Sequence, residues 1–139
     1  MYNMDNELKV IITGPTDFED YELLKGVCNK LLEDRIREGY KITILSGHSK
    51  GADILGERYA DECGFEKKLF EPKERHGSKA NSIRNTKMIE EANALIVFTK
   101  KDSQGIQRLI KHATDKHLIV REITEEQQSL LKNAYDSLN

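Results

Sequence analysis

Residues 46–53, with the sequence SGHSKGAD, combine the residue types of an anion-binding turn. They follow the apolar run 42–45 and lead into an amphipathic pattern. A buried strand that turns through glycines into a helix presents free backbone N–H groups at the positive end of the helix dipole. Gly47 and Gly51 allow a sharp turn and a close approach to a ligand, and Lys50 adds a mobile positive charge. The stretch is predicted to form half of a phosphate or nucleotide pocket; the alternative is a strand-to-helix turn whose glycines serve geometry alone.

Apolar runs and helical spacing alternate along the chain. Continuous apolar runs predict strands at residues 8–13, 41–46, 68–71, 94–98 and 117–120. Apolar residues at helical spacing predict helices at residues 17 or 20 to 38, 51–63, 81 or 82 to 92, 102 or 103 to 113, and 124–138. Strands of this kind are typical of a parallel sheet that is buried on both faces. The prediction is an α/β chain with a single domain over residues 1–139, a three-layer Rossmann-like fold around a parallel sheet of about five strands.

The loops after the first four strands are expected to converge. In a parallel sheet they emerge at the same edge, and ligands bind where the strand order reverses. Each loop contains a glycine, and several carry hydroxyl groups or cations. The residues predicted to bind the ligand are Gly14, Thr16, Phe18, Ser46, Gly47, Lys50, Gly51, Asp53, Gly77, Arg84, Asn85, Ser103 and Gly105.

Three of these side chains have more than one interpretation. If the third helix begins at residue 81 or 82, Arg84 opposes the helix dipole, and a bound anion would offset that cost. If the helix begins at residue 78, Arg84 can simply pair with a nearby acidic residue. Asn85 can hydrogen-bond a sugar or base edge or serve as a polar residue at a helix start. Asp53 can accept a hydrogen bond from a ribose hydroxyl or compensate the helix dipole.

Two common nucleotide-binding motifs are absent from the sequence. The first loop lacks Gly-x-Gly-x-x-Gly, and no strand is followed by Gly-Lys-Ser/Thr, which excludes a P-loop ATPase. His48 and His76 are not part of a cysteine or carboxylate cluster, so neither a metal nor another cofactor is predicted. Cys28 and Cys63 lie among apolar helical neighbours, where buried reduced thiols are expected.

Charge and hydropathy argue against two classes of partner. Lys and Arg number 22 against 24 Asp and Glu, and the resulting net charge of -2 disfavours nucleic-acid binding. The longest apolar run, residues 94–98, is too short to cross a bilayer, and residues 1–7 hold no apolar signal core. A cytoplasmic protein without membrane contact is expected.

Taken together, these motifs resemble the SLOG superfamily, and within it the small bacterial and phage proteins related to YspA. The matching residues are Gly14 with Phe18, Ser46-Gly47-x-x-Lys50-Gly51-Ala52-Asp53, Gly77-x-x-Ala80, Ile83-Arg84-Asn85, Met88 and Ser103-x-Gly105. The resemblance implies a Rossmann-like fold that binds nucleotides or nucleotide-derived ligands and commonly pairs through helical faces. The chain departs from the branch at Lys73, where a tryptophan is usual, and at Asn81, where glycine is preferred.

The phosphoribohydrolase relatives in this superfamily carry a catalytic glutamate that this chain lacks. Their Arg-Lys-x-x-Met motif is matched by Arg84 and Met88, whereas residues 102–109 read DSQGIQRL and place Leu109 at the glutamate position. Without that carboxylate, the known cleavage of an N-glycosidic bond has no evident acid or base.

The resulting hypothesis is a binding module that senses or sequesters a nucleotide, an ADP-ribose-like or an NAD-like ligand. The first alternative is an N-glycosidic hydrolase that uses Glu74, Asp53 or Asp17 on nucleoside monophosphates. The second is a DNA-processing adaptor, against which the net charge argues. A homo-oligomer is expected, with Leu130, Leu131, Tyr135 and Leu138 of the last helix either at the interface or packed on the chain's own sheet.

Overall fold

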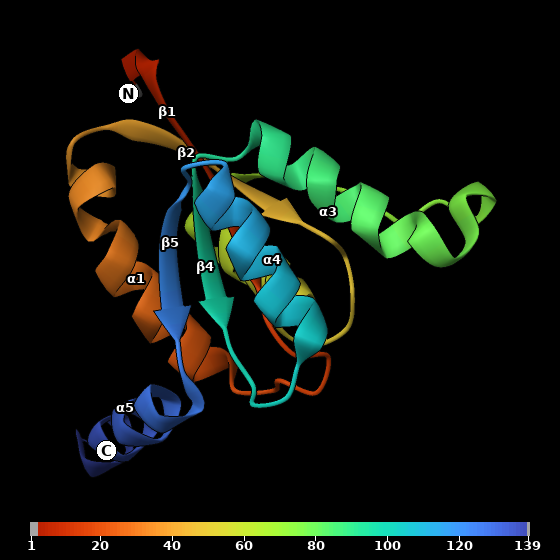
Figure 1. The fold of residues 1–139 in the computed structure, drawn as a ribbon. Coiled ribbons are helices and arrows are strands. Elements are labelled where there is room, and N and C mark those ends of the chain that lie inside the picture. The colour runs from red at the N-terminus through yellow and green to blue at the C-terminus, as the bar shows by residue number, and fades with distance from the viewer. Residues whose placement is uncertain (1–2, 139) are drawn as a thin grey trace.

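The computed structural model of the protein describes residues 3–138. Its sheet consists of β1 (Asn3–Thr13), β2 (Tyr40–Ser46), β3 (Glu66–Leu69), β4 (Ala94–Phe98) and β5 (Ile119–Ile123). All neighbouring strands are parallel and lie in the order β3-β2-β1-β4-β5 (Figure 1). The chain builds the sheet outward from β1 in one direction and then, from β4 onward, in the other. The strand order therefore changes direction between β1 and β4, which is where such sheets hold their ligands.

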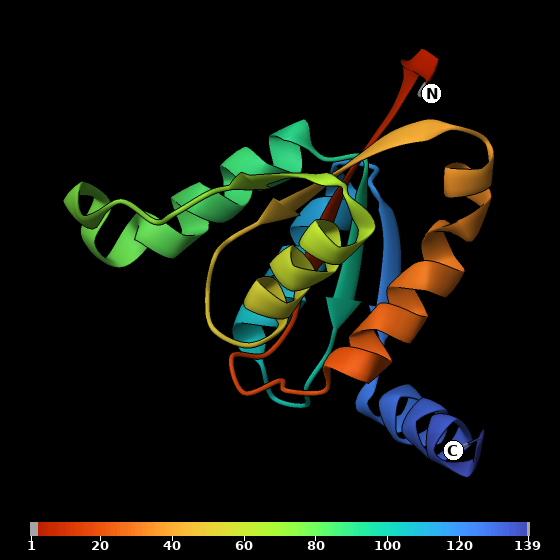
Figure 2. The same cartoon turned by 180° about the vertical axis from the view of Figure 1, so that it is seen from behind.

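Helices cover both faces of the sheet. They are α1 (Tyr21–Arg37), α2 (Ala52–Cys63), α3 (Ala80–Glu91), α4 (Gln104–Asp115) and α5 (Glu125–Leu138), with the 3-10 helix η1 (Glu74–Lys79) before α3. Val10 and Ile12 of β1 pack with α1 and α2, whereas Ile11 packs with α3 and α4. Figures 1 and 2 show the two helical layers from opposite sides. The predicted α/β, three-layer Rossmann-like fold is confirmed.

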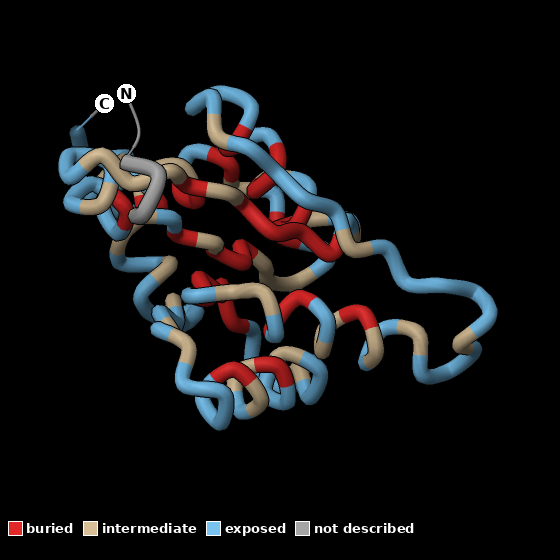
Figure 3. The backbone as a smooth tube through the Cα atoms, turned by 90° about the horizontal axis from the view of Figure 1, so that it is seen from above, coloured by how far each residue is buried: buried red, intermediate tan, exposed pale blue. Residues whose placement is uncertain are grey.

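Burial decreases from the centre of the sheet to its edges (Figure 3). Every residue of β4 is buried, whereas every residue of β3 is exposed. The prediction that the strands are covered on both faces therefore holds for the central strands and not for β3 and β5. The edge strands also differ from their predicted ranges, since β3 begins two residues earlier than residue 68 and β5 two residues later than residue 117.

The physical reason for these shifts is that edge strands are defined by pairing rather than by apolar residues. Glu66, Lys67 and Lys68 belong to β3 because they lie in register with β2, where Thr43 is opposite Glu66. Charged residues are common on exposed edge strands and give no hydrophobic signal. The apolar pattern therefore places such a strand incorrectly.

Side chains at the helix starts explain where three helices begin. The carboxylate of Asp20 accepts from the N–H of Leu23 at the start of α1, and Ser103 caps α4. Thr124 and Gln127 exchange side-chain-to-backbone hydrogen bonds of 2.9 and 3.2 Å, which is the predicted capping box before α5.

The last helix packs on α1 and leaves part of its apolar surface open. An added Cβ at Gly26 would lie 2.7 Å from the hydroxyl oxygen of Tyr135, so the glycine makes room for this contact. Leu131 also packs against the core, whereas Leu130 and Leu138 are 64% and 84% exposed. The described part of α5 thus packs on α1 through Leu131 and Tyr135 and leaves Leu130 and Leu138 exposed, while the expected homo-oligomer stays a prediction.

The two cysteines differ in burial. Cys28 is buried as expected, whereas Cys63 is exposed because it is the last residue of α2, at an exposed helix end. Within residues 3–138, no helix has both the length and the apolar composition that crossing a bilayer requires.

Candidate functional site

A cavity of about 460 Å³, here called the central cavity, lies at the carboxyl ends of β1 and β4, between α3 and α4. The loop after β1, the start of α2, the first turns of α3 and the loop before α4 all contribute to it. Its lining residues are Thr13, Gly14, Pro15, Thr16, Asp17, Ser49, Asp53, Asn81, Arg84, Asn85, Met88, Lys100, Ser103, Gly105, Ile106 and Leu109. The cavity therefore occupies the position where the strand order reverses.

The structure brings seven of the thirteen predicted residues together around this cavity. They are Gly14, Thr16, Asp53, Arg84, Asn85, Ser103 and Gly105. The other six, which do not line it, are Phe18, Ser46, Gly47, Lys50, Gly51 and Gly77. These six nevertheless differ in what they do for the site.

Three of the six, Phe18, Lys50 and Gly77, lie away from the cavity. Phe18 is buried, with its ring centroid 4.8 Å from that of Phe98 in the core. Gly77 lies in η1, which projects from the body of the molecule together with the start of α3 (Figures 1 and 2). Lys50 is exposed on the turn before α2. Direct ligand contacts for these three residues have no support in the geometry.

Gly51 does not line the cavity but packs against the loop after β1, which does. Its φ is +83°, and an added Cβ would lie 2.6 Å from the carbonyl carbon of Thr16. The N–H of Ala52 also donates to the carbonyl oxygen of Pro15, at 3.3 Å. The turn before α2 therefore supports the loop after β1, and only glycine fits at this contact.

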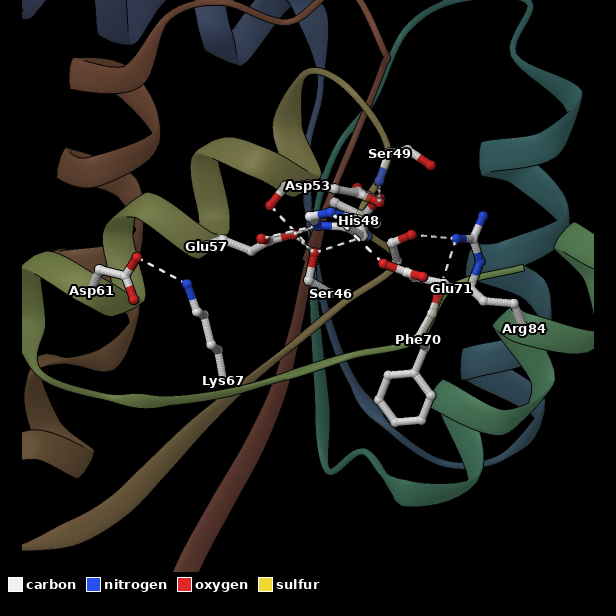
Figure 4. A network of polar contacts seen from close by, with 12 residues as sticks. Ser46, His48, Ser49, Asp53, Glu57, Asp61, Lys67, Phe70, Glu71 and Arg84 are labelled. Atoms are coloured by element: carbon white, nitrogen blue, oxygen red, sulfur yellow. Dashed lines mark hydrogen bonds and ion pairs between the residues drawn. The ribbon is translucent and has the colours of Figure 1, made fainter. Parts of the chain in front are cut away.

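Arg84 lies in the second turn of α3, not the first, because the helix begins at Ala80. The argument that an anion must offset a cation at the helix start therefore does not apply. The side chain is 8% exposed, and its Nη1 donates to the carbonyl oxygens of Gly47, at 2.5 Å, and Phe70, at 3.4 Å (Figure 4). These bonds tie α3 to the ends of β2 and β3.

The remaining groups of the Arg84 guanidinium face neighbours on its own helix. Its Nε donates to Asn85 at 2.8 Å, and its Nη2 donates to Asn81 at 3.3 Å. A guanidinium has five N–H donors, and the four bonds within the described chain leave one of them without a protein acceptor. Burial lowers the pKa of Arg84, which the nearby charge of Asp53 opposes.

Asp53 is a second buried charged group at the cavity, and it is 5% exposed. Its Oδ1 accepts from the hydroxyl of Thr13 at 2.5 Å, and its Oδ2 accepts from the N–H of Ser49 at 3.3 Å. Burial raises the pKa of Asp53, against the lowering effect of these hydrogen bonds and of Arg84. The desolvation of the carboxylate thus outweighs its partners.

Gly47 makes the approach of these two charged groups possible. An added Cβ at Gly47 would lie 2.7 Å from Nη1 of Arg84 and 2.9 Å from Oδ2 of Asp53. Any other side chain would occupy the space that the guanidinium and the carboxylate use. Gly47 therefore belongs to the site through its backbone, although it does not line the cavity.

Ser46, His48 and Glu57 form a polar network behind this turn (Figure 4). The hydroxyl of Ser46 donates to Oε2 of Glu57 at 2.7 Å, and Nδ1 of His48 lies 2.8 Å from the same oxygen. The hydrogen bond and charge of Glu57 raise the pKa of His48 above its usual value. Since the N–H of His48 bonds to Ser46 at 3.0 Å, this network fixes the backbone on which Gly47 and Ser49 are placed.

The first turn of α4 forms another wall of the cavity. Ser103 caps the helix by accepting from the N–H of Ile106, and the first N–H groups of any helix lack partners within it. An added Cβ at Gly105 would meet nothing within 4 Å. This wall therefore offers backbone donors and free space to a ligand.

Sequence reasoning missed several residues at the site. Glu57 looked like an ordinary helical carboxylate, although its position four residues after Asp53 places both on the same buried face of α2. Lys100 was missed because no motif or spacing around it distinguishes it from the other lysines of the chain. Leu109, at the position where hydrolase relatives have glutamate, is 8% exposed and lines the cavity. The position equivalent to the catalytic glutamate therefore lies at the same cavity, but it carries no carboxylate.

Among residues 3–138, no three His, Cys, Asp or Glu side chains lie close enough to share a metal ion. His48 lies in the turn after β2, and His76 lies in η1.

The chain was compared with known proteins. A sequence model described as "YspA, cpYpsA-related SLOG family" matches residues 8–76, from β1 to η1. The comparison with curated protein sequences gave no significant match. A crystal structure described as a predicted subunit of tRNA methyltransferase from Methanocaldococcus jannaschii is similar, with 17% identity, a TM-score of 0.40, and coverage of 94% of this chain and 76% of that chain. On the match over residues 8–76, the chain belongs to the YspA, cpYpsA-related SLOG family.

Proposed function

We propose that the central cavity binds a nucleotide or nucleotide-derived ligand through a phosphate group, and that the protein senses or sequesters this ligand. One observation carries the proposal: the buried guanidinium of Arg84, one of whose N–H groups has no acceptor in the described part of the chain, lines the same cavity as the first turn of α4. Ser103 caps that turn at the N–H of Ile106, and the other first-turn N–H groups have no partner within the helix. Arginine guanidinium groups and helix N-termini are both well suited to hold phosphate. Here they share one cavity.

The rest of the lining suits the other parts of a nucleotide. Asp53 and Asn85 offer acceptors and donors for sugar hydroxyls or a base edge, and Met88 and Ile106 offer apolar surface. The volume of about 460 Å³ lies within the range of small-molecule sites. With a net charge of -2, the molecule as a whole does not attract anions, so the attraction for an anionic ligand would come from local groups such as Arg84 and Lys100.

The test is isothermal titration of the protein with ADP, comparing the wild type with Gly105→Glu and Gly105→Gln. Both side chains have open space at this position, and a glutamate in the first turn suits the helix dipole, so both variants are expected to fold. We expect Gly105→Glu to weaken ADP binding by about tenfold or more, because its carboxylate repels the phosphate, whereas Gly105→Gln weakens it less. Equal binding by all three proteins, or none by the wild type, would contradict the proposal.

One observation favours hydrolysis of an N-glycosidic bond as a second candidate function. Asp53 lies in the cavity with a raised pKa, as a general acid requires. The other carboxylates suggested by the sequence are less suitable, since Asp17 is paired with Lys100 and Glu74 does not line the cavity. Incubation with AMP should then release free adenine, and Asp53→Asn should abolish the release. Intact AMP after prolonged incubation would exclude this candidate.

A further inference from the structure

A small cavity of about 140 Å³, here called the arm cavity, lies where η1 and the start of α3 meet the end of β3. It belongs to the part of the molecule that projects from the body (Figure 2). Among the residues that line the two cavities, only Arg84 is common to the arm cavity and the central cavity. The arm cavity is smaller than sites for drug-sized ligands, which begin at about 300 Å³, so it suits a smaller molecule than a nucleotide.

One part of the lining of the arm cavity is apolar. Leu69, Phe70 and Ile83 supply most of this surface, and Ala80 adds a methyl group. Leu69 is 40% exposed, and Phe70 and Ile83 are half-buried. Covering apolar surface of this kind is favourable, because water is released from it. The arm cavity therefore favours a ligand with an apolar body.

The other part of the lining is cationic. Around the arm cavity, Lys73, Arg84 and Lys87 outnumber the carboxylate of Glu71. That carboxylate has a neighbour of its own, since its Oε1 lies 3.9 Å from Nε2 of His48. The guanidinium of Arg84 is held by four bonds to the protein and adds its charge. The arm cavity is thus locally positive on a chain whose net charge is -2.

The two lysines of the arm cavity differ from the lysines of the neighbouring strand. Lys67 and Lys68 of β3 each pair with a carboxylate, at 2.9 and 2.8 Å. Over residues 3–138, Lys73 and Lys87 have no carboxylate within ion-pair distance. An anion in the arm cavity can therefore bind both ammonium groups without displacing a partner.

His76 adds a third polar group to the arm cavity. Its Nδ1 is shielded from solvent and has no hydrogen-bond partner in the described part of the chain. A buried polar atom without a partner costs free energy, and such atoms are uncommon in folded proteins. His76 lines the arm cavity, so a ligand oxygen there can accept a hydrogen bond from Nδ1–H.

This combination of groups fits a carboxylate better than a phosphate. A phosphate group has oxygens on every side and needs donors around it, whereas half of the arm cavity offers only carbon atoms. A carboxylate has two oxygens at one end, which two ammonium groups and one imidazole can satisfy. The remainder of a carboxylic acid can be apolar and lie on the apolar surface.

We propose that the arm cavity binds a small carboxylic acid whose apolar body is about the size of an aromatic ring. The carboxylate contacts Lys73, His76 and Lys87, and the apolar body packs on Phe70 and Ile83. This site is separate from the nucleotide site of the central cavity and does not depend on it.

The test is NMR titration of the labelled full chain with benzoate, benzamide and inorganic phosphate. Benzamide has nearly the shape of benzoate without its charge, and phosphate has charge without an apolar body. The amide signals of His76 and Ile83 report on the arm cavity, because both residues line it. We expect benzoate to shift these signals saturably and to bind at least about tenfold more tightly than benzamide or phosphate.

Lys87→Gln tests the cations of the arm cavity. It should weaken benzoate binding by about fivefold, because it removes one charged donor. Lys79→Gln is the matched control: Lys79 is exposed at the end of η1, outside the arm cavity, and its loss changes the net charge equally. It should alter the affinity by less than about twofold, because solvent and salt screen its charge.

Four results would overturn the proposal. They are the absence of a saturable shift with benzoate, binding of benzamide as tight as that of benzoate, binding of phosphate as tight as that of benzoate, and equal effects of the two substitutions. The proposed nucleotide function is tested with ADP at other residues, so it stands or falls independently of these results.

Discussion

Arg84 and Asp53 are charged groups that the fold buries near each other, and both side chains lie against Gly47. Taking either charge out of water is costly unless hydrogen bonds compensate it. Four bonds hold the guanidinium, and Thr13 and Ser49 hold the carboxylate. Burying both charges lowers the free energy of unfolding compared with apolar side chains at these positions. We therefore assign the arrangement to ligand binding.

Gly47→Ala should therefore destabilise the protein. The added methyl group would lie within 3 Å of both Arg84 and Asp53, so the buried pair would have to shift. We expect the free energy of unfolding in urea to fall by about 1–3 kcal/mol, as for other overpacked sites. Gly105→Ala is the control, because its methyl group meets open space, and it should stay within about 0.5 kcal/mol of the wild type. Equal effects of the two substitutions would contradict this account.

Asp53 predicts a pH dependence of stability with a definite sign. Burial raises its pKa in the folded protein above the unfolded value of 3.8, so its stabilising contribution is complete below that value and is lost as pH rises through the folded pKa. Asp53→Asn should therefore raise the free energy of unfolding at about pH 7, and the gain should vanish below about pH 4. The hydroxyl of Thr13 can reverse its hydrogen bond to suit the amide. A loss of stability at neutral pH would show that the charged carboxylate stabilises the fold.

At the level of elements, the turn between β2 and α2 carries the site because both of its sides are fixed. On one side Gly47 bonds to Arg84 of α3, and on the other Ser46 and His48 bond to Glu57 of α2. His48 has a φ of 59°, which is unusual for a residue other than glycine. The polar network holds this turn in its strained conformation.

The His48 network predicts a second pH dependence. Glu57 raises the pKa of His48 above 6.5, with help from Glu71 on the far side of the ring and against the effect of Lys67. His48 therefore stabilises the fold fully below about pH 6.5, and this contribution is lost as pH rises through the raised pKa. We expect the difference in unfolding free energy between wild type and His48→Asn to be larger at about pH 5.5 than at about pH 9.

Asparagine is chosen because it tolerates a positive φ. His117, which is exposed and also has a positive φ of 64°, provides the matched control for backbone strain through His117→Asn. If the stability difference for His48→Asn did not change between the two pH values, the ion pair with Glu57 would not contribute.

The elements show which parts of the fold sequence alone can predict. β4 and the capping box before α5 agree with their predicted residues. Both depend only on residues that are close together in the sequence, a buried apolar run in one case and a local hydrogen-bond motif in the other. β3 is shifted, because its position depends on pairing with β2. Likewise, the cavity-lining positions of Gly14, Arg84 and Gly105 follow from loop convergence, whereas the buried contact of Glu57 with Ser46 depends on how α2 packs against β2.

At the scale of the whole molecule, the outer face of α5 is the clearest candidate for contact with another chain. We propose that the protein forms a homo-oligomer through this face, since Leu130 and Leu138 expose 64% and 84% of their surface. Light scattering after size exclusion should then give a mass above the 16.0 kDa of one chain, and Leu130→Glu should reduce it to 16.0 kDa. A wild type of 16.0 kDa would rule this out.

The central claim is that an anionic ligand occupies the cavity between β1 and β4, and NMR titration of the labelled protein with ADP tests it most directly. Glycine amides report on the position of the ligand. If the claim is right, ADP shifts the amide signals of Gly14 and Gly105, which line the cavity, and leaves those of Gly64 and Gly77, which lie outside it. If Gly14 and Gly105 do not move while the remote glycines do, or if no signal moves, the claim is wrong.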